Sequence, residues 1–376
     1  LDEVINDASP DTINGALALL RDDPNDAVRS RLLATAGLGG DEAKLKEAES
    51  LLAETAKQND PDQRIAKVYA FLAEGDARAA HAEAERPAKY ADQADAFLLG
   101  RARTALARGQ WSQALPDAEN VVTSRPGAPE PAALLARIKA HLETPEAGLA
   151  VLDTVSSETA ATKIARARIL GLQQGKADEA IELTTEVRED EDAAPVHEAW
   201  AQLIEGVLAY RSGAVGAAYE HALAAAKPEL RVDETLLVGT AQLFLALGRT
   251  SDAERILKRL SSGPSADLFT RAHVIAWWYA QSNDMRAGLA TLSGAGFGPE
   301  KEAKPAFRAL VIAELLKASP RAAERKRALS LYEEASKDLH WGTAASAALA
   351  TALLEVGDSE AAIATLEAGL AAAPNH

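Results

Sequence analysis

Cysteine is absent from this 376-residue chain, and aromatic residues make up only 5% of it. The absence of cysteine excludes disulfides, thiolate metal sites and cysteine nucleophiles. No apolar run approaches the roughly 18 residues that a membrane-spanning helix needs, so we expect no membrane insertion. With so few aromatic rings, the core has to be built from Ala, Leu, Val and Ile, and these small side chains suit closely packed helices.

Positive charge is scarce as well. Lys and Arg number 40 against 56 Asp and Glu, which gives a net charge of −16. A nucleic-acid-binding face neutralises phosphates with basic side chains, so this balance predicts that the protein does not bind nucleic acid. The same acidity disfavours adhesion to anionic lipid. We therefore expect a protein or peptide partner.

The sequence also lacks the usual motifs of catalysis and metal binding. The histidines, at positions 81, 141, 197, 221, 273, 340 and 376, form no H-x-x-x-H or E-x-x-H pair, and no G-x-S-x-G nucleophile elbow is present. The acidic stretch 188–192 lacks the ligand spacing of a calcium loop. The glycine-rich stretch 294–301 has no Lys-Ser/Thr pair after it and no predicted strand before it, unlike a phosphate loop. We predict no enzyme activity, no metal site and no cofactor.

A helical hairpin recurs along the chain. In "EVGDSEAAIATLEAGLAAAP" (355–374), Gly357 stands where a helix should end, because glycine adopts the left-handed conformation of a helix C-terminus without penalty. The next helix places small and apolar residues on one face at spacings of three and four. These residues are Ala362, Ile363, Leu366 and Leu370.

This spacing recurs throughout the chain. In most repeats a glycine is followed five residues later by a small residue, and in two repeats Leu142 or Asn283 takes the place of the glycine. Consecutive small residues lie 33 to 40 positions apart. They are Ala80, Ala114, Ala147, Ala180, Ala218, Ala253, Gly288, Ala328 and Ala362. This period, with closing prolines such as Pro126 and Pro374, resembles the tetratricopeptide repeat. The best single matches are 98–126 and 349–374.

The resemblance implies an all-α fold, a right-handed superhelical solenoid of helix-turn-helix repeats. About nine repeats occupy 61–376, and 1–60 holds degenerate repeats or a cap. Extra residues predict bends near 186–195 and 293–327. The repeats are degenerate, because Leu and Ala largely replace the bulky aromatic residues of the family, and the excess of Arg over Lys together with the abundance of Ala favours a bacterial source.

In function, the resemblance implies a non-enzymatic protein–protein interaction scaffold whose first helices line a concave groove. In this family, Lys, Asn and Arg at fixed positions of the groove clamp the C-terminal carboxylate of a chaperone tail. The matching positions here hold Leu99 and Arg103 in one repeat and Leu203 and Val207 in another, so the clamp pattern is missing and we expect no binding of chaperone tails. Rare aromatics and their neighbours are the candidate groove residues, because aromatic side chains anchor partners. These candidates are Tyr69, Arg103, Trp200, Leu203, Val207, Tyr210, His273 and Trp277. For Trp277 the alternative is burial of the ring between neighbouring repeats.

Two other functions remain open. The chain could be a structural assembly subunit that self-associates end to end, or a helical toroid enzyme, which the 5% aromatic content disfavours. The composition favours a bacterial envelope, secretion or motility complex. The absence of cysteine and the start at Leu1 favour a periplasmic or envelope location, with the cytoplasm as the alternative.

Overall fold

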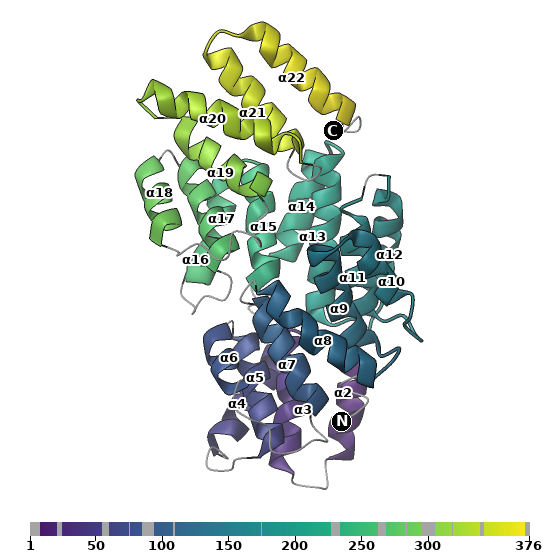
Figure 1. Cartoon of the computed structure of the whole chain (residues 1–376). Coiled ribbons are helices and arrows are strands. Elements are labelled where there is room, and N and C mark those ends of the chain that lie inside the picture. The colour runs from purple at the N-terminus through teal and green to yellow at the C-terminus, as the bar shows by residue number, and fades with distance from the viewer. Residues whose placement is uncertain are drawn as a thin grey trace. The chain divides into compact units, whose positions relative to one another are not determined.

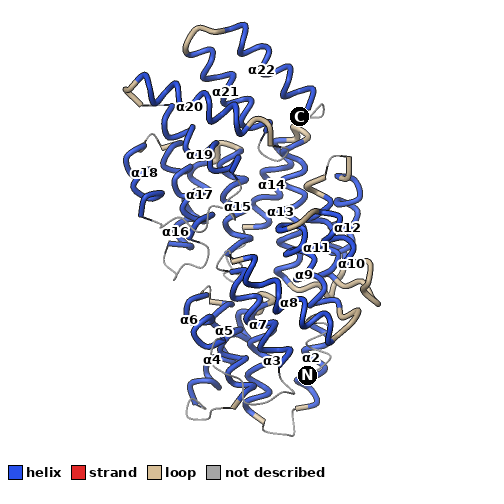
Figure 2. The backbone as a smooth tube through the Cα atoms, viewed as in Figure 1, coloured by secondary structure: helices blue, strands red, loops and turns tan. Residues whose placement is uncertain are grey.

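The structure is a computed structural model of the chain, and the residues that it describes fold as helices joined by short turns. No strand occurs among these residues (Figure 2). The described residues are 8–20, 25–54, 60–74, 76–84, 94–107, 110–173, 175–226, 234–261, 268–282, 284–294, 305–317, 319–338 and 342–372.

The chain divides into two compact units, which are described separately. Unit 1 contains Leu1–Glu205, Leu223–Leu237 and Arg259–Ala266. Unit 2 contains Gly206–Ala222, Val238–Lys258 and Asp267–His376.

Unit 1 consists of successive helical hairpins (Figure 1). Within it α3 pairs with α4, α5 with α6, α7 with α8, α9 with α10, and α11 with α12. First helices also pack on one another, α3 on α5, α5 on α7, and α9 on α11. The bounds are α2 Pro10–Leu19, α3 Asp26–Leu38, α4 Glu42–Glu54, α5 Pro61–Ala73, α6 Ala77–Ala84, α7 Ala94–Ala107, α8 Trp111–Ser124, α9 Pro129–Leu142, α10 Pro145–Leu152, α11 Ala160–Leu170 and α12 Ala177–Glu189.

The next four helices have residues in both units, and those that follow lie in unit 2. The shared helices are α13 Pro195–Arg211, α14 Val215–Ala225, α15 Glu234–Ala246 and α16 Thr250–Ser261. Unit 2 continues with the hairpins α17–α18, α19–α20 and α21–α22. Their bounds are α17 Leu268–Gln281, α18 Met285–Gly294, α19 Pro305–Lys317, α20 Ala322–Ala335, α21 Gly342–Glu355 and α22 Ser359–Ala372.

The predicted fold class is confirmed: the chain is an all-α solenoid of helix-turn-helix repeats. The segment 1–60 contributes the hairpin α3–α4, which packs on α5 and so joins the repeat array directly. The division at residue 60 and the two bends stay predictions. Of the second bend region, 293–327, residues 295–304 lie outside the described part of the chain.

The glycines that the sequence places at helix ends have the left-handed backbone that this role requires. Their φ angles are 75° at Gly175, 80° at Gly213, 69° at Gly248 and 84° at Gly357. A side chain in that conformation would be strained, so glycine is what lets the first helix stop and the second begin. Four other helix-end positions of the repeat lie outside the described residues, namely Gly75, Gly109, Asn283 and Pro374.

The small residues of the repeat lie at the contact between the two helices of a hairpin. Most are at most 1% exposed, namely Ala80, Ala114, Ala180, Ala218, Ala253, Ala328 and Ala362. A Cβ on Gly288 would lie 3.3 Å from the carbonyl oxygen of Ala276 on α17, and it would also displace the side chain of Leu315 on α19, whose Cδ2 would be 2.3 Å away. Ala147 departs from the pattern because it is only half-buried. Its neighbour Gly148 takes the close-approach position, where a Cβ would lie 2.6 Å from the Ala136 carbonyl oxygen.

Replacing Ala362 by leucine tests this close approach. We expect Ala362→Leu to lower the free energy of unfolding by about 1–3 kcal/mol, because overpacking displaces neighbouring side chains. The matched control is Ala364→Leu, on the exposed face of the same helix α22, which should change the unfolding free energy by less than about 0.5 kcal/mol. Chemical denaturation monitored by circular dichroism measures both, and equal midpoints would contradict the argument.

Candidate binding site

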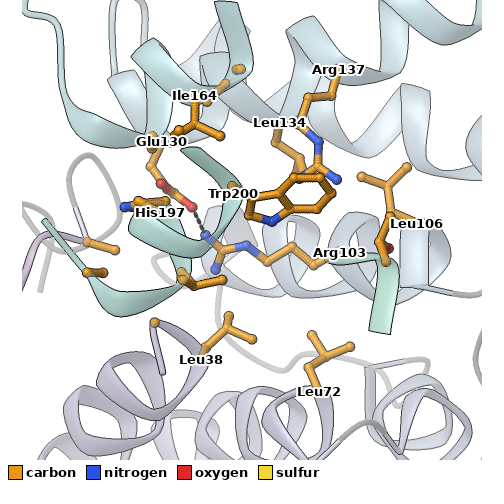
Figure 3. A pocket seen from close by; sticks show the side chains of 18 of the residues that line it. Leu38, Leu72, Arg103, Leu106, Glu130, Leu134, Arg137, Ile164, His197 and Trp200 are labelled. Carbon is orange, nitrogen blue, oxygen red and sulfur yellow. Dashed lines mark hydrogen bonds and ion pairs between the residues drawn. The ribbon is translucent and has the colours of Figure 1, made fainter. Parts of the chain in front are cut away.

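The first helices of six consecutive hairpins converge on one pocket of unit 1, with a volume of about 220 Å³ (Figure 3). These helices are α3, α5, α7, α9, α11 and α13. The backbone N–H of Val196, at the start of α13, donates to the carbonyl oxygen of Gly39, which follows α3, at 3.2 Å. This hydrogen bond joins the last of the six helices to the first. All the residues that line the pocket belong to unit 1.

The lining of the pocket carries positive charge, unlike the protein as a whole. Arg103 on α7, Arg137 on α9 and Arg168 on α11 line it, and Glu130 is the one carboxylate among its described lining residues. Three positive charges less one negative charge give a formal local charge of +2, against −16 for the chain. The three arginines come from the first helices of three successive hairpins.

Arg103 is held in place from two sides. Its guanidinium forms an ion pair with the Glu130 carboxylate (Figure 3). The same guanidinium lies 5.2 Å from the centre of the Tyr69 ring. Burial acts to lower the pKa of Arg103, but Tyr69 and Glu130 outweigh burial and raise this pKa above its usual value. Arg103 therefore remains charged although its side chain is only 13% exposed.

Arg168 is oriented by an aromatic ring. Its guanidinium carbon lies 3.6 Å from the ring centroid of Trp200 on α13, and Trp200 is 7% exposed. Stacking on an aromatic face keeps the planar guanidinium in one orientation. The second lining tryptophan, Trp111, is itself stacked on His141 with ring centroids 4.0 Å apart.

Aliphatic side chains complete the wall of the pocket. They are Leu38, Leu72, Leu106, Leu134 and Ile164, and His197 lies near them (Figure 3). Apolar walls around a few fixed charged groups are typical of ligand pockets, because the walls exclude water and strengthen each electrostatic contact. The arrangement can therefore bind an anionic group that has an apolar neighbour.

The described residues were also searched for metal-binding groups and for membrane-spanning helices. Those residues contain no group of three His, Asp or Glu side chains placed to hold a metal ion. None of the described helices has the length and apolar character needed to cross a membrane.

Three of the eight predicted groove residues come together at this pocket. Arg103 and Trp200 line it, and Tyr69 contacts Arg103 from α5. Leu203 is 4% exposed on α13 and does not line the pocket.

The other four residues lie in unit 2. Val207 and Tyr210 are half-buried on α13. His273 and Trp277 on α17 are 1% and 5% exposed, and their ring centroids lie 6.1 and 6.0 Å from that of Phe307 on α19. This placement matches the alternative in which the ring of Trp277 is buried between neighbouring repeats. A partner-binding role for these residues stays a prediction.

Arg137, Arg168 and Glu130 are the charged pocket residues that sequence reasoning missed. Arg103 precedes the small residue Ala114 by eleven positions, and Arg137 precedes Gly148 by the same number. Arg168 precedes Ala180 by twelve. Reading the position eleven residues before the small residue would have found Arg103 and Arg137, provided that the register is counted from Gly148 and not from Ala147, whereas Arg168 lies one residue earlier.

Comparison with known proteins identifies the fold. No protein-family profile matches the chain, and no curated protein matches it by sequence. A solved structure of the human IFIT1 dimer with PPP-AAAA is similar over 98% of this chain and 94% of that chain, with 13% identity and a TM-score of 0.51. A second human IFIT1 dimer structure, with m7Gppp-AAAA, gives 14% identity over 98% and 95% of the two chains, with a TM-score of 0.49. The chain thus has a tetratricopeptide-like helical repeat fold.

The prediction that excludes nucleic acid is contradicted by this comparison. Human IFIT1, whose chain has the same type of fold, is solved with the RNA ligand PPP-AAAA. Net charge was a poor criterion because it averages over the whole surface, whereas a ligand responds to the potential at its own site. Here the pocket has a local charge of +2 within a chain of −16.

The burial of Trp277 predicts a structural role in unit 2. We expect Trp277→Ala to lower the free energy of unfolding by about 3–5 kcal/mol, because it removes a large ring from a packed site against Phe307. Leu354→Ala, at a side chain that is 54% exposed on α21, is the control and should cost less than about 0.5 kcal/mol. Urea denaturation measures both variants. A loss below 1 kcal/mol for Trp277→Ala would favour the groove role instead.

Proposed function

We propose that this chain is a non-enzymatic binding scaffold, and that the unit-1 pocket holds an anionic segment of a protein or peptide partner. The observation that carries the proposal is the set of three arginines, one from each of three successive first helices, against a single lining carboxylate. The coarser part, a repeat scaffold of a type used for binding, has support from the similarity to IFIT1.

The energetic argument rests on where the arginines lie. Arginine presents several N–H donors in a rigid fork, and its hydrogen bonds to an anion contribute on the order of 1.5–3 kcal/mol each. In this pocket the guanidinium of Arg168 is already fixed by Trp200 and that of Arg103 by Glu130. Groups ordered before binding lose little entropy when the ligand arrives, so more of the interaction energy appears as affinity.

The composition of the lining supports binding over catalysis. The one carboxylate, Glu130, is engaged in an ion pair with Arg103. The remaining lining side chains are chiefly aliphatic and aromatic. A general acid–base mechanism needs a side chain that is positioned to exchange a proton with a substrate, and Glu130 is instead hydrogen-bonded to Arg103.

We further propose that the scaffold works in a bacterial envelope, secretion or motility complex. This part rests on the alanine-rich, cysteine-free composition and on the repeat resemblance. A periplasmic or envelope location agrees with a chain that uses no cysteine.

A nucleic-acid end is a second candidate ligand for the same pocket. It is favoured by the IFIT1 structure with PPP-AAAA. Arginines bind phosphate oxygens and an indole ring can stack on a base, so Arg137, Arg168 and Trp200 fit this ligand chemically.

Self-association is a candidate of a different kind, and it concerns unit 2. The last hairpin leaves large apolar side chains in water: Ile363 is 57% exposed, Leu366 43% and Leu370 52%, all on α22. Solenoids need a polar outer face on their terminal repeats to stay soluble as monomers. A second copy of the chain would cover this apolar stripe.

Substitutions in the pocket test the leading proposal. A fluorescently labelled octapeptide of alternating Ala and Glu should bind the protein in an anisotropy titration, and the Ala–Lys octapeptide should not. Arg137→Ala and Arg168→Ala should each weaken binding of the acidic peptide by roughly tenfold or more, as loss of a charged hydrogen bond does. Glu130→Gln, which releases Arg103 from its ion pair, should strengthen it.

The matched control is Arg166→Ala on the same helix α11, which removes the same charge outside the pocket and should leave the affinity unchanged. Equal losses at Arg166 and Arg168 would mean general charge attraction and would overturn the pocket as the site. The tetranucleotide AAAA with a 5′-phosphate is the second ligand. Tighter binding of this oligonucleotide, with the same dependence on Arg137 and Arg168, would replace the peptide by the second candidate.

The self-association candidate predicts that the molar mass measured by light scattering rises with protein concentration. Ile363→Glu with Leu370→Glu should remove this rise, because burying two new carboxylates in the contact costs more than the apolar stripe gains. Leu19→Glu, at a side chain that is 85% exposed on α2, is the control and should leave the rise in place. A constant monomer mass for the unsubstituted protein would end this candidate.

A further inference from the structure

We infer that the hairpin α21–α22 is a docking surface for a helix of a partner protein, and that this helix has an apolar stripe with basic flanks. The surface lies in unit 2, so the inference goes beyond the pocket of unit 1. It concerns the same apolar stripe of α22 that a second copy of the chain would cover. The two occupants differ in the charge that they bring to the contact.

The apolar stripe of α22 includes a position that is buried in the preceding hairpins. Leu366 lies four residues after the small residue Ala362 and is 43% exposed. In the preceding hairpins the side chain four residues after the small residue is at most 6% exposed, with α9–α10 counted from Gly148. These side chains are Ala84, Ala118, Leu152, Thr184, Ala222, Leu257, Leu292 and Tyr332. In this series of described hairpins, α22 alone leaves a core position in water.

In the hairpin before it, the first helix of the next hairpin covers this position. Tyr332 on α20 is fully buried, and it shares one apolar core with residues of α21, on which α20 packs (Figure 1). The α21 residues in that core are Ala345, Leu349 and Ala352, at spacings of four and three. No helix follows α22 in the described part of the chain. The face of α22 therefore has the form that α20 presents to α21, and a helix with small and apolar side chains at the same spacing fits it.

The charges around the stripe select a basic partner. Residues 342–372 contain four carboxylates and no Lys, Arg or His. The carboxylates are all exposed, and none forms an ion pair with another described residue; they are Glu355, Asp358, Glu360 and Glu367. Two copies that met through this hairpin would bring four carboxylates from each side into one contact, and like charges repel. Lys or Arg on the flanks of a partner helix would compensate the carboxylates instead.

The two features of the surface contribute differently to binding. Ile363, Leu366 and Leu370 are 57%, 43% and 52% exposed, so a docked helix would remove a large apolar area from water and gain affinity. The acidic rim contributes selectivity, because it attracts basic flanks and repels acidic ones. The same rim disfavours an anionic lipid surface as the occupant.

Titration with three matched helical peptides of three heptads each tests the inference. The Lys peptide has Leu at the first and fifth positions of each heptad, Lys on both sides of this stripe, and Ala elsewhere. The Glu peptide has Glu in place of Lys. The scrambled peptide has the composition of the Lys peptide with Leu distributed around the helix, so it measures general attraction to a chain of charge −16. In fluorescence anisotropy, we expect the Lys peptide to bind roughly tenfold or more tightly than either of the others.

Substitutions on α22 locate the contact. Glu360→Lys with Glu367→Lys leaves the rim with two positive and two negative charges, so this variant should lose the preference for the Lys peptide over the Glu peptide. Glu333→Lys with Glu334→Lys, at exposed residues of α20, changes the net charge equally and should keep the preference. Ile363→Ser with Leu370→Ser should weaken binding of the Lys peptide roughly tenfold or more, because the apolar contact is lost. Circular dichroism and thermal unfolding verify that the variants are folded.

Each other result overturns the inference. Equal affinity for the Lys and Glu peptides would remove the basic flanks, and no binding of either would remove the helix. Loss of binding in Arg168→Ala rather than in the α22 variants would move the peptide to the unit-1 pocket. A molar mass that rises with protein concentration and that the Lys peptide does not lower would assign the stripe to a second copy. None of these results affects the proposed function of the pocket, since its test uses an acidic ligand and residues of unit 1.

Discussion

The close approach of the two helices in each hairpin is the constraint on which the rest of the structure depends. Alanine or glycine at one position lets the backbones come together, as the fully buried Ala253 and the close approach of Gly148 to the Ala136 carbonyl oxygen show. A side chain eleven or twelve residues before the small residue lines the pocket in three successive repeats, as Arg103, Arg137 and Arg168 do. Binding residues can thus be contributed once per repeat, by copying one position rather than by building a dedicated loop.

The charge of the pocket in unit 1 is opposite in sign to the net charge of the whole chain. The chain carries −16, yet its pocket gathers Arg103, Arg137 and Arg168 around Glu130. The acidic remainder favours solubility and lessens non-specific attraction of polyanions, while the pocket attracts an anion that can enter it. An overall acidic protein with a basic pocket is therefore selective, since only a ligand that reaches the arginines experiences their charge.

The fold could be predicted from the sequence because the period of glycines and small residues repeats many times, and each occurrence supports the others. The site could be predicted only in part. Arg103 and Trp200 were found, but Arg137 was hidden by the one-residue shift from Ala147 to Gly148. The burial of Trp277 depends on Phe307, which lies 30 positions further along the chain in the next repeat, and a single hairpin holds no information about such a contact.

The hydrogen bond from Val196 to Gly39 has a consequence for how unit 1 can evolve. An open array of repeats tolerates duplication or loss of a repeat, because each repeat contacts only its neighbours. In unit 1 this hydrogen bond joins the start of α13 to the residue that follows α3, and these are the last and the first of the six helices that line the pocket. Adding or deleting one hairpin between α3 and α13 would separate Val196 from Gly39 and change the set of residues that face inward. The hydrogen bond between Val196 and Gly39 thus ties the geometry of the pocket to the number of repeats in this part of the chain.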